Sequence, residues 1–208
     1  MKAIWSLTAA TTLAAAIALS GSAVANSSPT AESTSPAAEP RKAVTTFSGN
    51  GTFRVGQDIK PGTYVSTSTG SFGGYWERLS CATGEFDCII ANDNVTGQTF
   101  VTIEKSDRYF STSRMGTWRL ASKVKPKKAA RAFAGDGMYR VGIDIRPGTY
   151  VSSPSSSLGG YWERLSCATG EFDCLIANDL VDGRTFVKIS KDDKYFSTSR
   201  MGKWKRAR

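Results

Sequence analysis

The feature that most constrains the fold of this chain is an internal duplication with a period of 86 residues. Aligning residues 51–120 with residues 137–206 gives 50 identical positions out of 70, and the block from Gly73 to Cys88 recurs unchanged from Gly159 to Cys174. Two copies this similar are expected to share one fold and, where a ligand exists, the same ligand. Two copies of a binding surface also give avidity, which a single-site enzyme would not need.

Each copy consists of short strands separated by turn residues. Pro61-Gly62 is typical of a type II turn, and no segment keeps a helical period. The expected strands of the first copy are residues 53–55, 63–66, 75–80, 89–91, 99–103, 108–112 and 116–120, and Asn92-Asp93-Asn94 is interpreted as a turn. The predicted fold class is all-β, with two tandem domains that are each a small β-sandwich or a partly open β-barrel.

The N-terminal segment is typical of an export signal. Lys2 gives it a positive start, residues 3–20 are uncharged and rich in Ala and Leu, and Ala23-Val24-Ala25 is the pattern that signal peptidase recognises. We therefore expect a signal peptide at residues 1–25 and a secreted mature protein. Residues 26–47 are rich in Ser, Thr, Ala and Pro, which predicts a disordered linker before the first repeat.

The remaining predicted boundaries follow from the duplication and the charge pattern. We expect the first repeat at 48–120, a basic linker at 121–133, and the second repeat with a basic C-terminal tail at 134–208.

The four cysteines are expected to form disulfides, because export places them in an oxidising compartment. Four cysteines permit three pairings, but Cys81 with Cys88 and Cys167 with Cys174 bracket the same six residues, a spacing that suits a bridge across a hairpin turn. Closing so short a loop contributes about 2 kcal/mol or somewhat less per bridge. A metal site would need all four thiolates to converge, so no metal and no cofactor is expected.

The chain contains no histidine. This absence excludes Ser-His-Asp and Cys-His nucleophilic sites, His-ligated zinc and the usual general base near neutral pH. We therefore expect no enzymatic activity and no catalytic residue. The acidic pairs Glu85 with Asp87 and Glu171 with Asp173 lie on the tight stapled turns, and we interpret them as solvated turn carboxylates rather than as an acid/base pair or a calcium site.

The net charge of +9 is concentrated outside the repeats. Residues 48–120 contain seven basic and seven acidic side chains, and residues 134–202 contain eight and nine. The candidate polyanion-binding residues are Lys123, Lys125, Lys127, Lys128, Arg131, Lys203, Lys205, Arg206 and Arg208. The expected partners are cell-wall polymers or an anionic membrane surface, and nucleic acid is not expected because neutral domains lack a basic groove. The alternative is that these residues only keep the segments extended and soluble.

Aromatic and arginine residues alternate along one expected strand of each repeat. The candidate ligand-binding residues are Trp76, Arg78, Trp162 and Arg164. Strand alternation places Trp76 and Arg78 on one face, where they can stack on a sugar ring and bind its hydroxyls. Packing in the core is the alternative, and it is favoured for both tryptophans. It is favoured more strongly for Trp118 and Trp204, which end the last expected strands.

These motifs together resemble a known repeat. The series Val55-Gly-x-Asp58-Ile59-x-Pro61-Gly62-Thr63-Tyr64, Tyr75-Trp76-x-Arg78-Leu79-Ser80, Ile89-Ile90-Ala91-Asn92-Asp93 and Gly116-x-Trp118 is similar to a repeat of exported and surface proteins of high-GC Gram-positive bacteria. The resemblance covers both copies and implies the fold and an extracellular location, but no biochemical activity. Members commonly carry Cys where this chain has Gly74, Met115, Gly160 and Met201. One disulfide has therefore replaced another.

Three functions are compatible with the sequence. The first is a secreted, non-catalytic tandem-repeat protein that associates with the bacterial cell envelope through its β-repeats and basic segments. The second is an exported, bacteriocin-like antimicrobial precursor that releases a cationic C-terminal fragment, residues 194–208, on proteolysis. The third is an inhibitor of an extracellular hydrolase that presents the stapled loop. The ligand and the oligomeric state remain open at this point.

Overall fold

In the computed structural model, which describes residues 42–126 and 128–207, the stretches of alternating apolar and polar residues form β-strands. The first repeat contains β1 (Thr46–Phe47), β2 (Gly51–Arg54), β3 (Gly62–Thr67), β4 (Gly74–Leu79), β5 (Ile89–Val95), β6 (Gln98–Ile103), β7 (Tyr109–Ser113) and β8 (Trp118–Leu120). The second repeat contains β9 (Ala132–Phe133), β10 (Gly137–Arg140), β11 (Gly148–Ser152), β12 (Gly160–Leu165), β13 (Leu175–Val181), β14 (Thr185–Ile189), β15 (Tyr195–Ser199) and β16 (Trp204–Arg206). Three short 3₁₀ turns complete the structure: η1 (Phe86–Cys88), η2 (Ala121–Lys123) and η3 (Phe172–Cys174). None of the helical segments among the described residues has the length and hydropathy needed to cross a membrane.

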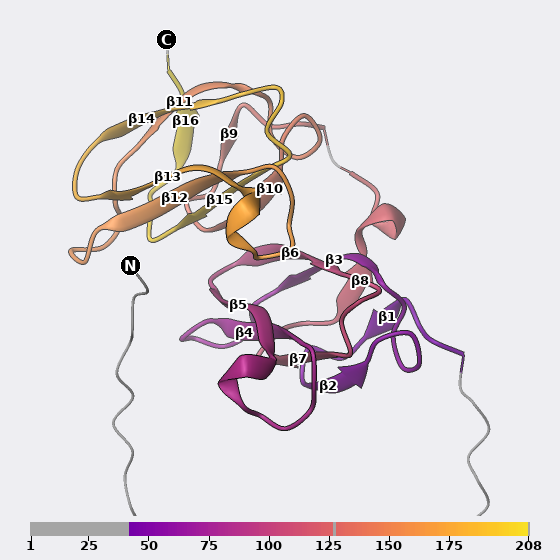
Figure 1. Cartoon of the computed structure of the whole chain (residues 1–208). Coiled ribbons are helices and arrows are strands. Elements are labelled where there is room, and N and C mark those ends of the chain that lie inside the picture. The colour runs from indigo at the N-terminus through magenta and orange to yellow at the C-terminus, as the bar shows by residue number, and fades with distance from the viewer. Residues whose placement is uncertain (1–41, 127, 208) are drawn as a thin grey trace, which may run out of the picture. The chain divides into compact units, whose positions relative to one another are not determined.

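Each repeat is a sandwich of two antiparallel four-stranded sheets (Figure 1). The strand orders are β1-β8-β3-β6 and β2-β7-β4-β5 in the first repeat, and β9-β16-β11-β14 and β10-β15-β12-β13 in the second. The sheets do not close into a barrel, so of the two predicted architectures the sandwich is the one that forms. The all-β fold class and the tandem arrangement are confirmed.

Aromatic side chains fill the space between the two sheets. The Phe47 ring centroid lies 5.0 Å from that of Tyr64, 5.9 Å from that of Phe110 and 6.3 Å from that of Trp118, which is fully buried. The second repeat reproduces this cluster around Phe133. The indole N–H of Trp118 donates a hydrogen bond of 3.1 Å to the Thr112 hydroxyl, which satisfies the buried polar group. The preference for core packing at Trp118 is confirmed, as it is at Trp204.

The repeats begin before the predicted boundaries. Val44 bridges Ile59, and β1 contributes Phe47 to the core, so residues 42–47 are ordered, in contrast to the disordered linker predicted up to residue 47. In the same way β9 lies inside the predicted basic linker, whereas β16 forms where the last strand of the second repeat was expected. A two-residue strand has no readable alternation, which explains why the sequence pattern did not reveal it. The predicted signal peptide and the linker up to residue 41 lie outside the described residues.

The predicted turn at residues 92–94 is wrong. These three residues continue β5, where Asn92 pairs with Glu77, Asp93 with Trp76 and Asn94 with Tyr75. Their side chains are exposed on the outer strand of the sheet, where polar residues are tolerated in spite of their low strand propensity.

Candidate functional site

Strand alternation places the first pair of candidate ligand-binding residues inside the protein. On β4, Trp76 is 2% exposed and Arg78 is completely buried. Their counterparts on β12, Trp162 and Arg164, are half-buried. Arg78 therefore offers no surface to solvent and Trp76 offers almost none outside the cavity described below, whereas the second pair retains some access. Because the two repeats are nearly identical in sequence, this difference in exposure must arise from the parts of the chain that cover each pair.

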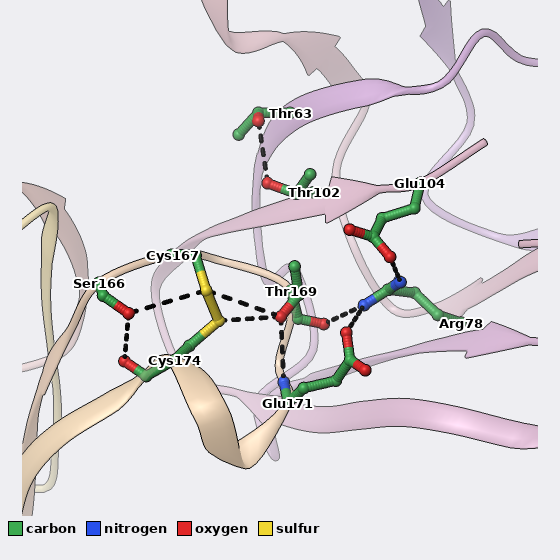
Figure 2. Close-up of a disulfide and its surroundings, with 9 residues drawn as sticks. All are labelled: Thr63, Arg78, Thr102, Glu104, Ser166, Cys167, Thr169, Glu171 and Cys174. Carbon is green, nitrogen blue, oxygen red and sulfur yellow. Dashed lines mark hydrogen bonds and ion pairs between the residues drawn. A yellow bond between two sulfur atoms is a disulfide. The ribbon is translucent and has the colours of Figure 1, made fainter. Parts of the chain in front are cut away.

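Arg78 is covered because it is the centre of an ion-pair network that joins the two repeats (Figure 2). Its guanidinium group donates two hydrogen bonds, of 2.8 and 2.9 Å, to the fully buried Asp107 carboxylate, and one of 2.9 Å to Glu104. The second repeat supplies two further acceptors, the Thr169 carbonyl oxygen at 2.7 Å and the Glu171 carboxylate at 2.9 Å. Burial alone lowers the pKa of Arg78, but the hydrogen bonds to Asp107 and Glu171 outweigh it and raise the pKa overall.

The acceptors from the second repeat lie on its stapled loop, which we define as residues 167–174. The disulfide joins Cys167 to Cys174 across this loop, and Cys81 is joined to Cys88 in the first repeat, as predicted. Cys167, Cys174 and Asp173 lie close enough together to resemble a metal site. Both cysteine sulfur atoms are in the disulfide, however, so they are not available as thiolate ligands. Glu171 is an ion-pair partner rather than the solvated turn carboxylate that we expected, because its loop packs on the other repeat.

The second stapled loop docks through its backbone as well. The Thr102 amide on β6 donates a 2.8 Å hydrogen bond to the Ala168 carbonyl oxygen. Gly170 lies so close to the first repeat that a Cβ atom there would be 2.6 Å from the Trp76 ring. An apolar cluster fills the rest of the contact with the buried residues Phe100, Ala121, Met138, Leu165, Ala168 and Cys174. The two repeats are therefore held together by an apolar contact with a buried arginine beside it.

A cavity of about 180 Å³ lies at the same contact. Its lining includes Trp76 and Asp93 from the first repeat and Tyr161 and Glu163 from the second. Asp93 retains contact with solvent, yet desolvation by the surrounding protein and the nearby charge of Glu163 raise its pKa to about 7. Desolvation also raises the pKa of Glu163, whose carboxylate accepts a hydrogen bond from Tyr161. Sequence reasoning missed this pair because its members belong to different repeats.

The basic segments of the sequence meet along the β9–β16 edge of one sheet of the second repeat. The described candidate residues Lys123, Lys125, Lys128, Arg131, Lys203, Lys205 and Arg206 are all exposed, and Lys127 and Arg208 lie outside the described residues. β9 pairs antiparallel with β16, and Lys205 lies opposite Ala132. The next residues along, Arg131 and Arg206, are therefore neighbours although they are far apart in sequence.

Arg146 is linked to the same place through Tyr150, whose hydroxyl donates a 2.7 Å hydrogen bond to the Arg146 carbonyl oxygen and whose strand β11 pairs with β16. Burial raises the pKa of Tyr150, whereas the positive charges of Arg206, Arg146 and Arg131 act on the same hydroxyl in the opposite direction. We call Arg131, Arg146 and Arg206 the arginine cluster. None of its members forms an ion pair with a carboxylate of the residues that the structure describes.

The first repeat has no such cluster. Its corresponding residues are Thr45, Lys60 and Leu120. The sequence did contain one signal for Arg146: the first repeat has Lys60 at the same position, and both residues precede a Pro-Gly turn. Only the strand register shows that this position lies near the basic segments.

Fold and disulfides together define a class: a tandem β-sandwich protein in which each domain carries one disulfide-stapled loop. The family model of the Rv1352-like extracellular domain matches residues 45–119 and again residues 131–205. The chain belongs to this family, and the protein is secreted. No curated protein and no solved structure matches the chain.

Proposed function

We propose that this secreted protein is a non-catalytic binding protein that associates with anionic polymers of the bacterial cell envelope through its second repeat. The observation that carries the proposal is the arginine cluster: Arg131 and Arg206 lie on adjacent paired strands, Arg146 acts with them on the Tyr150 hydroxyl, and none has a carboxylate partner among the described residues. Guanidinium groups bind phosphate and carboxylate through paired hydrogen bonds, and neighbouring like charges are stabilised by a bound anion. The exposed side chains of Lys123, Lys125, Lys128, Lys203 and Lys205 extend the same positive field.

The difference in charge between the two repeats supports this proposal. The first repeat is neutral and lacks the cluster, whereas the second carries it at the point where two basic segments converge. The absence of histidine from the whole chain supports a non-catalytic role, because the most common general base is missing. The partner would be a phosphate- or carboxylate-bearing wall polymer or an anionic membrane surface, and not nucleic acid.

The test compares binding of the mature protein with that of the double variant Arg131→Thr/Arg206→Leu, which installs the residues of the first repeat. Purified cell walls and vesicles with and without anionic lipid distinguish the two sources of anion. We expect wild-type binding that weakens with salt, and a loss of about tenfold in affinity in the variant, because each surface charge contributes roughly 1 kcal/mol or less at low salt.

The matched control removes two exposed basic residues elsewhere. Lys105→Gln/Arg108→Gln changes the net charge by the same amount, but on the first repeat. Binding that falls equally in both double variants would show a diffuse charge effect and contradict a role for the cluster. Binding that survives at high salt would instead assign recognition to another surface of the repeats.

The antimicrobial alternative gains no support from the structure. The cationic fragment of residues 194–208 contains Phe196 and Trp204, both fully buried in the core of the second repeat. Its release would remove β15 and β16 from their sheets. The inhibitor alternative retains one favourable observation, which is that the stapled loop of the first repeat presents Phe86 to solvent with 91% of its surface exposed.

A further inference from the structure

The contact between the two repeats is head-to-tail, because each repeat uses a different surface. The second repeat contributes its stapled loop, which we call the donor loop. The first repeat contributes the surface around Arg78, Trp76 and β6, which we call the acceptor surface. A contact of this heterologous kind between two similar units leaves one donor and one acceptor unused.

The unused donor is the stapled loop of the first repeat, residues 81–88. Its sequence is identical to that of the docked loop, and it is closed by the same disulfide. Glu85, the counterpart of Glu171, is exposed. A Cβ atom at Gly84 would have no neighbour within 4 Å among the described residues, whereas at Gly170 it would strike Trp76. The loop therefore has the docking geometry but no partner.

The unused acceptor is the matching surface of the second repeat. Arg164 donates to Asp193 through the same two hydrogen bonds, of 2.7 and 2.9 Å, that Arg78 donates to Asp107. Its side chain is 22% exposed because no loop covers it. On β14, Phe186 is 56% exposed, whereas Phe100, at the same place on β6, is 2% exposed. The Phe186 ring, over which the Arg184 guanidinium lies 5.0 Å from the centroid, and a cation with spare donors are thus both partly open to solvent.

We propose that the protein self-associates head to tail, with the free stapled loop of the first repeat (residues 81–88) of one molecule docking on the Arg164–Phe186 surface of a second copy. In this contact Arg164 donates to the Thr83 carbonyl oxygen and to the Glu85 carboxylate. The Lys188 amide donates to the Ala82 carbonyl oxygen, as the Thr102 amide does to Ala168 within one chain. Each added molecule leaves a free donor and a free acceptor, so the assembly is open-ended unless its geometry closes a ring.

A second copy is the occupant because the molecule already contains the complementary pair of surfaces and shows how they fit. The contact between molecules differs from the one within the chain at several positions, and two of these differences remove groups that stabilise the contact within the chain. Ser190 stands where Glu104 binds the buried arginine, and Thr52 stands where Met138 fills the apolar cluster. The association is therefore weaker than the docking of the two repeats, which the linker also favours.

The loss-of-function test is sedimentation velocity of the mature protein, without any polyanion, over a concentration series of about 5 to about 500 µM. Gly84→Asn places a side chain where the docked loop would meet Trp162. Gly56→Asn is the matched control, since Gly56 also has a positive φ and open space around it. We expect concentration-dependent oligomers for the wild type and for the control, and loss of these oligomers in Gly84→Asn.

The gain-of-function test returns to the intermolecular contact the two groups that strengthen the intramolecular one. Thr52→Met/Ser190→Glu restores the missing apolar and carboxylate groups and is expected to tighten association about tenfold. Two results would overturn the proposal: a sedimentation coefficient that stays monomeric in both the wild type and this variant, or oligomers that Gly84→Asn leaves unchanged. Adding Gly84→Asn to this double variant distinguishes the expected result from aggregation of misfolded protein, because only specific association needs an intact loop.

Discussion

Arg78 and Arg164 hold equivalent positions but have different surroundings, and this difference explains most of the asymmetry between the repeats. Arg78 donates to three carboxylates and one carbonyl oxygen, whereas Arg164 donates to Asp193 among the described residues. A buried guanidinium is tolerated only when its donors are satisfied. The docked loop of the second repeat provides the last two acceptors, so Arg78 links the fold of one repeat to the position of the other.

Replacing Arg78 by methionine is expected to lower the free energy of unfolding by about 3–4 kcal/mol, because the fully buried Asp107 carboxylate loses its partner. Arg164→Met is expected to cost about half as much, since the Arg164 side chain is partly exposed. Urea denaturation of both variants measures the difference. Equal losses would contradict the role of the interface, and partial recovery in Arg78→Met/Asp107→Asn would confirm the cause.

The carboxyl group of Asp93 predicts a pH dependence of stability. Its pKa in the folded protein is about 7, against 3.8 as the ordinary value, so the folded state holds a proton that the unfolded state has released. Stability from this group is complete below the ordinary pKa and is lost as the pH rises through about 7. The Asp93→Asn variant is expected to gain about 1 kcal/mol at pH 8 and little at pH 4, a modest value because Asp93 retains contact with water.

Denaturation of the wild type and Asp93→Asn at several pH values checks this expectation. Asp179→Asn, the counterpart in the second repeat, is the control. The same pH profile in both variants would show that the effect does not arise from the meeting of Asp93 with Glu163.

Among the elements, β1 and β9 are the shortest and yet hold the centre of each core. Each contributes one phenylalanine, Phe47 or Phe133, around which the Tyr and Trp residues of other strands pack. Length is a poor guide to the energetic weight of a strand, because burial of one aromatic ring outweighs a few ladder hydrogen bonds.

Truncation of that ring gives the corresponding prediction. Phe47→Ala is expected to lower the free energy of unfolding by about 3–5 kcal/mol, because it leaves a cavity between the sheets. Phe86→Ala removes the same ring from an exposed site and is expected to change stability by about 0.5 kcal/mol or less. Thermal unfolding of the two variants compares the loss of a buried ring with the loss of an exposed one. Similar shifts in Tm would refute the assigned position of β1.

The stapled loops are the elements in which identical sequences acquire different roles. Both are closed by a disulfide over the same spacing, but one is docked on the other repeat and one is free. The disulfide limits the conformations of the loop before docking and so lowers the entropy lost on docking.

Removal of each disulfide separates these roles. Cys81→Ala/Cys88→Ala is expected to cost about 2 kcal/mol with an effect confined to its own loop. Cys167→Ala/Cys174→Ala is expected, in addition, to speed hydrogen exchange at the Thr102 amide, which donates to Ala168 in the docked loop. Unchanged protection of Thr102 in the second variant would show that docking does not depend on the staple.

At the scale of the whole molecule, two domains of nearly identical sequence have different surroundings and different roles. The first repeat is an acceptor with a satisfied arginine, and the second is a donor that also carries the arginine cluster. The first repeat therefore keeps a free stapled loop. The second repeat keeps a free acceptor surface around Arg164 and the arginine cluster. Attachment to an anionic polymer and head-to-tail association would use separate surfaces, so the two can act together on one molecule.

The sequence by itself determined the duplication, the all-β class and the two disulfides, because these depend on period, alternation and spacing within one repeat. It placed Trp118 and Trp204 in the core for the same local reason. Only the tertiary structure decided that Arg78 is buried, that Asp93 meets Glu163, and that Arg131 lies beside Arg206. These contacts join segments whose separation carries no periodic signal. The burial of Arg78 and the meeting of Asp93 with Glu163 exist only once the repeats have packed together, and Arg131 meets Arg206 only through the pairing of β9 with β16.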